Sequence, residues 1–507
     1  MKFIVHSILL ALGIWINGTA LIGGISEKRN ANFLTIGGGY SASGNQVSLE
    51  KNIQYLQRVM ADLDRKDAPH DIYFADGDHE GRDLQFMDKD FKIPKINLYL
   101  AEFAGSTKGL WNQYRNHDIA VDGPSKSAEV KKWFDTKGKK LSAEKDRLMI
   151  YFTGHGGRGE KKSPHNTIMY LWQDVNFRVN QFVAELDKLP EDLPVTMVMV
   201  QCYSGGFANI IFKEGDPKKG LSDHNRAGFY ATVHSRVAAG CTPDINEANY
   251  REYSTYFWEA LYGESRIGEK VEKPDYNGDG ETSYSEAHAY TILNSRTIDI
   301  PVKTSDAFLR HFSKTKNEKK DKKKVEGLWT ADSNYCDLLE FAGPNEKAVL
   351  EGLSKQLNLS GDNRGKATRD LAKKIDDTKK NLKKEEDKLR GEQRTLKTNL
   401  SKLIKAAWPE TASPYHPMTL KLLTSDDGGK LAAQLEKHKD FQKYKELGKK
   451  IKGFSDKQND EDRRWVKTQR MLRTLENVAL EANLPKMAEC KVLERYNQLV
   501  AAENKTF

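Results

Sequence analysis

Short apolar runs alternate with amphipathic stretches through the first 310 residues of the chain. Runs rich in β-branched and aromatic residues predict strands, and apolar residues at helical spacing predict helices between them. Because strands and helices alternate, the pattern predicts an α/β fold with a mostly parallel sheet flanked by helices. The predicted strands cover residues 31–37, 71–75, 148–154, 167–172, 195–200 and 228–233, the predicted helices cover 47–63, 129–134, 179–189 and 253–262, and the acidic stretch 76–90 is predicted as loop.

The pattern changes after residue 310. Residues 311–327 are rich in lysine and predict a solvated linker, or alternatively a cleavage site that releases the C-terminal region. Residues 328–507 predict a helical, coiled-coil-like C-terminal domain, with further amphipathic helices over 431–454 and 465–482. Apolar residues recur every seven positions at Ile375, Leu382, Leu389, Leu396 and Leu403, and Pro409 and Pro414 end this stretch. The companion heptad position is polar, which favours an antiparallel hairpin within the chain over a long parallel dimer.

The N-terminus predicts a signal peptide over residues 1–20. A basic start precedes an apolar segment at 3–16, and Gly18-Thr19-Ala20 supplies small residues for cleavage. A buried N-terminal element and an uncleaved anchor are the alternatives. No later segment reaches the length of a membrane-spanning helix. We therefore expect a secreted or periplasmic protein without an integral membrane span in the mature chain.

Charge and cysteine content constrain the function only weakly. The net charge of +9 arises mostly from lysine-rich stretches after residue 310, and nothing else resembles a nucleic-acid module, so we expect no nucleic-acid partner. The four cysteines are Cys202, Cys241, Cys336 and Cys490. If Cys202 stays free for chemistry, at most one disulfide can form.

Two of the predicted strands end in a reactive side chain followed by glycine. The run 148–154 ends at His155, and the run 195–200 leads to Cys202. In open α/β sheets the carboxyl ends of parallel strands meet at one edge, so the imidazole and the thiol are expected there together. A thiolate is the nucleophilic form, and a nearby imidazole helps to generate it. Either residue alone is more often packing or turn chemistry, but the combination predicts nucleophilic catalysis.

These segments resemble the caspase–legumain clan of cysteine peptidases, and most closely its legumain-like C13 branch. Residues 151–156 read Tyr-Phe-Thr-Gly-His-Gly, residues 202–205 read Cys-Tyr-Ser-Gly, and residues 230–232 also resemble the family. The resemblance covers about residues 30–300 and implies a caspase/legumain-like peptidase domain over residues 30–310. It implies a cysteine endopeptidase acting on protein or peptide substrates without a catalytic cofactor. His155 would be the general acid/base, Cys202 the nucleophile that forms an acyl-enzyme, and the Gly156 N–H an oxyanion donor.

The sequence departs from the family around the specificity pocket. Gly154 stands where legumain has aspartate, the two residues before Cys202 are not acidic, and the loop after the first predicted strand lacks the legumain Arg-His pair. An asparagine preference is therefore not implied. The candidate substrate-binding residues are Gln201, Asp76, Asp78, His234 and Ser235.

A separate motif at residues 275–286 fits an EF-hand loop. The ligands would be the side chains of Asp275, Asn277, Asp279 and Glu286 and the main-chain carbonyl of Glu281. The motif predicts a structural Ca²⁺ site beside the sheet, and the alternative is a turn that binds nothing tightly.

Three functional alternatives remain open on the sequence. By analogy with legumain-like enzymes, the helical region 325–507 would inhibit the peptidase within the same molecule. A catalytically inactive pseudo-enzyme of the same fold would act as a binding or scaffold protein. A calcium-dependent surface interaction protein would instead use the helical region as its working part.

Overall fold

The computed structural model describes residues 29–318 and 324–507, so the predicted signal peptide lies outside the described residues, as do five residues of the predicted linker. The strands are β1 (Asn30–Gly38), β2 (His70–Phe74), β3 (Leu84–Phe86), β4 (Gln113–Arg115), β5 (Asp146–Gly154), β6 (Gly156–Gly157), β7 (Ile168–Leu171), β8 (Asp174–Arg178), β9 (Val195–Met199), β10 (Arg226–Tyr230) and β11 (Val302–Lys303). Strands β1, β2, β5, β9 and β10 of the main sheet occur where apolar runs predicted them, with small shifts at their ends, whereas its edge strand β11 was not predicted.

The helices divide between the two halves of the chain. Those of the first half are α1 (Val47–Asp62), α2 (Lys95–Ala104), α3 (Ser127–Thr136), α4 (Val179–Leu186), α5 (Tyr253–Tyr262), α6 (Tyr284–Asn294) and α7 (Thr304–Phe312). Those of the second half are α8 (Tyr335–Leu339), α9 (Pro344–Gln356), α10 (Arg364–Ala407), α11 (Pro417–Thr424), α12 (Asp426–Lys437), α13 (Lys439–Asn483) and α14 (Cys490–Glu503).

A six-stranded sheet forms the centre of the α/β part, in the order β11-β10-β9-β5-β1-β2. Neighbours are parallel except at the β10–β11 edge. The predicted mostly parallel sheet is therefore confirmed. The run 167–172 does form a strand, but β7 pairs antiparallel with β6 and β8 in a separate sheet. The acidic stretch 76–90 is not all loop, because buried Leu84 lies in β3, which pairs with β4.

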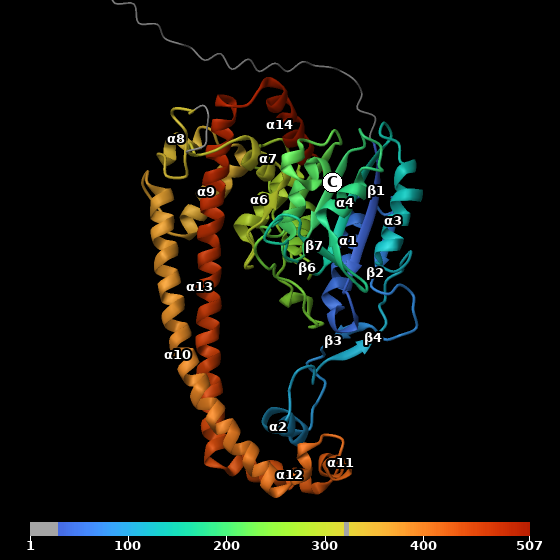
Figure 1. The fold of residues 1–507 in the computed structure, drawn as a ribbon, viewed down its shortest axis with the longest axis vertical. Helices are drawn as coiled ribbons and strands as arrows, with labels where there is room; N and C mark the ends of the chain where they lie inside the picture. Colours follow the sequence, from blue (N-terminus) through green and yellow to red (C-terminus); the bar gives the residue numbers. More distant parts are fainter. Residues whose placement is uncertain (1–28, 319–323) are drawn as a thin grey trace, which may run out of the picture.

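Helices cover both faces of the sheet, as Figure 1 shows. Alternate residues of β5 point to opposite faces, which is the period-two pattern of a strand. Ile150 and Phe152 join one buried cluster with residues of α3, α4, α7 and α14, whereas Met149 and Tyr151 join another with α1, α5 and α6. Because both faces are buried, the strands read as nearly continuous apolar runs.

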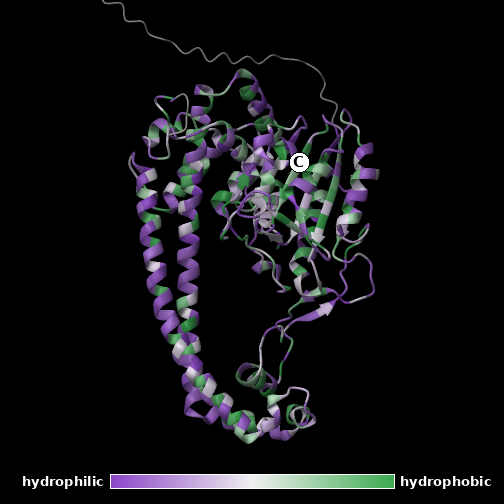
Figure 2. Cartoon of the chain, in the orientation of Figure 1, coloured by the Kyte–Doolittle hydropathy of each residue, from purple (hydrophilic) through white to green (hydrophobic). Residues whose placement is uncertain are grey.

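The C-terminal region contains the predicted antiparallel hairpin. Its arms are the long helices α10 and α13, and Lys379 pairs with Asp462 across them at 2.6 Å. The sequence predicted separate helices over 431–454 and 465–482, but α13 runs continuously through both. Figure 2 shows mostly hydrophilic arms beside hydrophobic strands. The heptad stripe drifts off the contact, since Leu396 is buried but Leu403 is 42% exposed.

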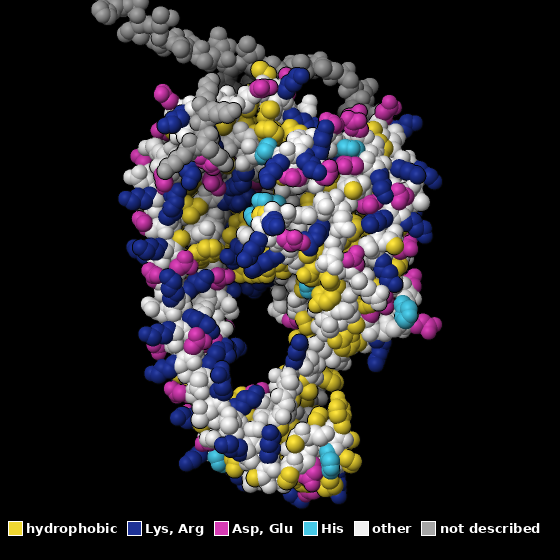
Figure 3. All heavy atoms as spheres, viewed as in Figure 1, with side chains coloured by type: hydrophobic (Ala, Val, Ile, Leu, Met, Phe, Trp, Pro, Cys, Tyr) yellow, Lys and Arg dark blue, Asp and Glu magenta, His cyan; other side chains and the backbone are white. Residues whose placement is uncertain are grey.

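The tip of the hairpin meets an arm of the α/β part. Helix α2 extends from the sheet beyond β3 and β4, and its Ile96, Tyr99 and Phe103 pack with residues of α10, α12 and α13. The Tyr99 hydroxyl also donates to Glu436 at 2.6 Å. The chain therefore closes a ring, and the space-filling view shows an opening between the hairpin and the α/β part (Figure 3).

The end of the helical region packs into the α/β core. Tyr496 and Leu499 of α14 belong to the cluster on one face of the sheet, and Phe507 packs against Phe33 on the other. The buried Glu503 carboxylate accepts hydrogen bonds from the first turn of α7. Residues 328–507 therefore do not pack only among themselves. Within residues 29–318 and 324–507, no helix combines the length and apolar character that crossing a membrane requires.

Candidate active site

Sheet register brings the two predicted catalytic residues to one level. Phe152 of β5 pairs with Met199 of β9, and His155 and Cys202 each come three residues later. The main chains are in close contact beyond that point, because a Cβ built on Gly156 would lie 2.3 Å from the carbonyl oxygen of Cys202. The main-chain segments that carry His155 and Cys202 therefore lie side by side at the ends of adjacent parallel strands.

Two acceptors orient His155. Its Nε2 lies 2.8 Å from the carbonyl oxygen of Gly44 and 2.9 Å from Oε1 of Gln46. The Gln46 amide is itself held, since its Nε2 donates to the Ser43 carbonyl at 3.1 Å. Because both partners of the ring are acceptors, Nε2 carries the proton and Nδ1 keeps its lone pair. The ring therefore presents a base at Nδ1.

Sequence reasoning missed this orienting pair. Gly44 and Gln46 lie just before α1, in the loop that follows β1, and β1 is the neighbour of β5 in the sheet. The sequence held no signal for Gly44, because any residue type can supply a main-chain carbonyl.

Main-chain groups hold the Cys202 thiol. Its Sγ lies 3.3 Å from the amide nitrogen of Ala238, which donates to it. The next residue, Tyr203, has a left-handed backbone (φ 62°), and its N–H donates to the Arg236 carbonyl at 2.8 Å. This sharp turn begins the 3-10 helix η3 (Ser204–Ile211) and leaves the cysteine at the strand end.

Burial keeps both catalytic candidates neutral at rest. Desolvation raises the pKa of Cys202, the hydrogen bond from the Ala238 N–H offsets part of this rise, and the nearby Asp299 carboxylate adds to it. Desolvation also lowers the pKa of His155, which its hydrogen bond to Gly44 partly offsets. A thiolate therefore has to form by proton transfer to the imidazole during reaction, not before it.

The candidate substrate-binding residues fall into three places. Gln201 precedes Cys202 but is only 1% exposed, and neither polar atom of its amide has a hydrogen-bond partner among the described residues. Asp76 and Asp78 follow β2, where Asp76 faces the buried Asp83, and burial raises the pKa of Asp83 to about 6. Gln201, Asp76 and Asp78 do not line the cavity that His234 and Ser235 line.

His234 and Ser235 lie on another side of the strand ends. They line a cavity of about 780 Å³ together with residues of α7 and α13, and neither His155 nor Cys202 lines it. Sequence reasoning grouped them with Asp76 because all follow strands, but the path of the loop after β10 carries them away.

Cys241 is a neighbour that the sequence did not indicate. Its Sγ lies 3.8 Å from the carbonyl oxygen of Gly154, the residue before His155. All four cysteines are free, so Cys241 forms no disulfide.

The EF-hand-like loop is shaped by its own hydrogen bonds. Asp275 Oδ1 accepts from the Gly278 N–H at 2.8 Å, and Glu286 accepts from the Tyr276 and Ser283 amides at 2.7 and 2.8 Å. Ser283 and Glu286 form a capping box that starts α6. In the described parts of the chain, no three His, Cys, Asp or Glu side chains are grouped to hold a metal ion. The residue order fits a calcium loop, and calcium binding by it stays a prediction.

Helix α13 supports the loop beside Cys202. Arg470 is buried, and its guanidinium donates to the carbonyls of Ile292, Ser295, Thr297 and Asp299. The Asp299 carboxylate in turn accepts from the Ala239 N–H at 2.7 Å, next to the residue that donates to Cys202. The helical hairpin is thus connected to the thiol through a chain of hydrogen bonds.

The sequence matches no family model, and no curated protein matches it.

Proposed function

We propose that the protein is a cysteine endopeptidase of the caspase–legumain type that acts outside the cytoplasm. The observation that carries the proposal is the placement of His155 and Cys202 at adjacent strand ends, with His155 Nε2 bound to Gly44 and Nδ1 left as the base. The sequence motifs around both residues and the strand order β2-β1-β5-β9 support the same assignment.

The reaction would proceed through an acyl-enzyme. His155 Nδ1 takes the thiol proton as Cys202 Sγ attacks the peptide carbonyl, and the Gly156 N–H stabilises the negative oxygen. The imidazolium then gives its proton to the leaving amine. Water, deprotonated by the same nitrogen, hydrolyses the thioester and restores the thiol. No step requires a cofactor.

The test is cleavage of a diverse peptide library by the full chain, beside Cys202→Ala. Cleavage that disappears in the variant supports the peptidase, and the residue before the cut defines its specificity. A library left intact by the full chain and by the shortened-hairpin form described in the Discussion counts against it. The same assay with about 1 mM calcium, repeated on Asp279→Asn, tests the calcium loop, because Asp279 is exposed and its loss spares the α6 cap.

A second candidate function arises from the thiol itself. Burial and Asp299 raise the pKa of Cys202, which favours an unreactive pseudo-enzyme acting as a scaffold. Labelling separates the two, because a thiol electrophile modifies Cys202 much faster than the exposed Cys336 only if His155 activates it. Loss of that difference in His155→Ala supports the enzyme.

Inhibition by the C-terminal region is part of the proposal to be tested. Trp465 of α13 lies under the Arg236 guanidinium at 5.0 Å, and the Arg236 carbonyl holds Tyr203 beside the nucleophile. This contact can regulate access to the strand-end loop, although the Arg470 bonds give the same helix a supporting role.

A further inference from the structure

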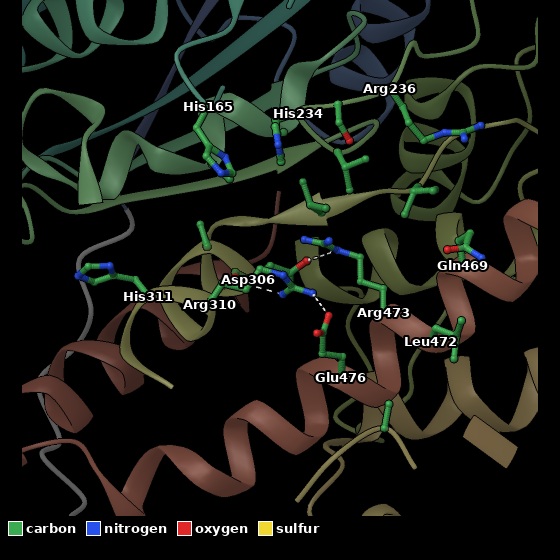
Figure 4. A pocket seen from close by; sticks show the side chains of 18 of the residues that line it. His165, His234, Arg236, Asp306, Arg310, His311, Gln469, Leu472, Arg473 and Glu476 are labelled. Carbon is green, nitrogen blue, oxygen red and sulfur yellow. Dashed lines mark hydrogen bonds and ion pairs between the residues drawn. The ribbon is translucent and has the colours of Figure 1, made fainter. Parts of the chain in front are cut away.

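The cavity that His234 lines has two facing walls. It has a volume of about 780 Å³, which is in the range of small-molecule sites. In Figure 4, His165 and His234 enter it from the sheet side, while Arg310 of α7 and Arg473 of α13 enter from the opposite side. A molecule in this space would contact both parts of the chain at once.

Positive charge exceeds negative charge around the cavity. The Asp306 carboxylate lies 3.4 Å from Arg473, and Glu476 pairs with Arg310 at 2.8 Å. The charged lining residues are Arg236, Arg310, Arg369, Arg473, Asp306 and Glu476. Arg236 forms no ion pair with any residue that the structure describes, and its buried Nε has no hydrogen-bond partner there. Arg369 pairs with Asp332, so among the described residues Arg236 is the lining cation that no carboxylate neutralises.

The charge of Arg473 also acts on the two histidines that line the cavity. Their ring centroids are 3.9 Å apart, and neither ring forms a hydrogen bond with a described residue. Burial lowers the pKa of both, to about 4 for His234, and the Arg473 charge lowers both further. Neutral imidazoles retain an N–H that can donate to an anion.

We propose that this cavity binds a small anion carrying two or more phosphate or carboxylate groups. Guanidinium groups form paired, charge-assisted hydrogen bonds with both kinds of oxygen, and the facing imidazoles add donors from the other wall. The binding site does not depend on the cysteine chemistry. Its occupant would nevertheless hold the segment 234–236, whose Arg236 carbonyl bonds the residue after Cys202.

Calorimetric titration of the full chain with sodium tripolyphosphate and with citrate tests the proposal. We expect at least one to bind near neutral pH and low salt, and to bind more weakly as sodium chloride screens the arginines. Binding of tripolyphosphate alone assigns the site to phosphates, and binding of citrate alone assigns it to carboxylates. No binding of either overturns the proposal.

Variants locate the binding. Arg310→Gln and His234→Phe should each weaken it about tenfold, the loss expected for one charge-assisted hydrogen bond. Phenylalanine keeps the ring contact with His165, so this variant preserves packing. Arg82→Gln, on an exposed loop after β2, is the control and should bind normally. If Arg310→Gln does not fold, His234→Phe decides; unchanged affinity in a folded cavity variant overturns the site.

Discussion

The close approach of the β5 and β9 ends depends on the absence of a side chain at Gly156. The nearest atoms to an added Cβ include the Cys202 carbonyl oxygen at 2.3 Å and the Ile168 carbonyl oxygen at 2.9 Å, which are both main chain. Neither can rotate away as a flexible side chain would. The β5 and β9 ends can therefore approach this closely only with glycine at this position.

Gly156→Ala should lower peptide cleavage about 100-fold, because displacing the His155 segment from Cys202 by even about 1 Å costs that much. The measurement is kcat/KM on the best library peptide, with the melting temperature recorded beside it. Gly453→Ala, whose added Cβ meets nothing within 4 Å, is the matched control. Normal turnover by Gly156→Ala would show that the two strand ends need not approach so closely.

Asp299 gives a prediction with a defined pH window. Its pKa is raised to about 7 by burial, so its charge appears above that pH and raises the pKa of the Cys202 thiol. Asp299→Asn removes this charge and should lower the thiol pKa. Iodoacetamide should therefore label Cys202 faster in the variant above a pH of about 7 and equally fast below it, where Asp299 is protonated.

Mass spectrometry of the Cys202 peptide measures that rate, and exposed Cys336 in the same sample is the internal control. Faster labelling at every pH, acid included, would point to loosening of the loop at Ala239 and not to charge.

Sequence could place His155 and Cys202 at one edge of the sheet because each follows a readable strand in a local motif. It could not identify Gly44, which acts through a main-chain oxygen. It could not separate Asp76 from His234 either, because the paths of their loops depend on packing with α7 and α13.

Helix α13 connects the hairpin with the cavity and with the loop that ends at Asp299. Along its length it pairs with α10, contributes Arg473 to the cavity wall, and buries Arg470 against the loop that ends at Asp299. Apolar spacing predicted helical structure here, but not its continuity. The break expected between 454 and 465 is absent because this polar stretch packs along α10, where Gln458 bonds Glu386.

Arg470→Met should destabilise the protein by about 3 kcal/mol or more, because several buried carbonyls lose their donors together. Denaturant unfolding measures this. Arg464→Met on the same helix is the control, since Arg464 is half-exposed and bonds only Glu461 of its own helix, at 2.8 Å. Equal stability of the two variants would contradict the bracing role of Arg470.

At the scale of the whole molecule, the two parts of the chain meet at both ends of the hairpin. The base joins through α13 and α14, and the tip joins through α2. Sequence alone predicted the sheet and the hairpin as separate units, since periodicity describes faces of elements but not which distant faces meet. A truncation before residue 328 would therefore expose both sheet clusters, so a loss of activity in it would not measure inhibition.

A shortened hairpin gives the cleaner measurement. Lys379 and Asp462 face each other across the arms, so a four-residue Gly-Ser linker between them removes the outer hairpin while retaining Trp465, Arg470 and α14. If the tip inhibits the enzyme, cleavage should rise several-fold in this form; unchanged cleavage assigns any inhibition to the base. A companion full-length variant, Phe103→Ala, should loosen only the contact with α2.

The packing of residues 490–507 against strands that begin at residue 30 also sets an order in time. During translation the sheet strands leave the ribosome long before α14 is made. Part of their apolar surface therefore stays uncovered until the end of synthesis. The hydrogen bonds that connect Arg470 to the loop at Ala239 can likewise form only after α13 has been made. A nascent chain therefore carries its thiol for most of its synthesis without the hydrogen-bonded support that the finished chain supplies.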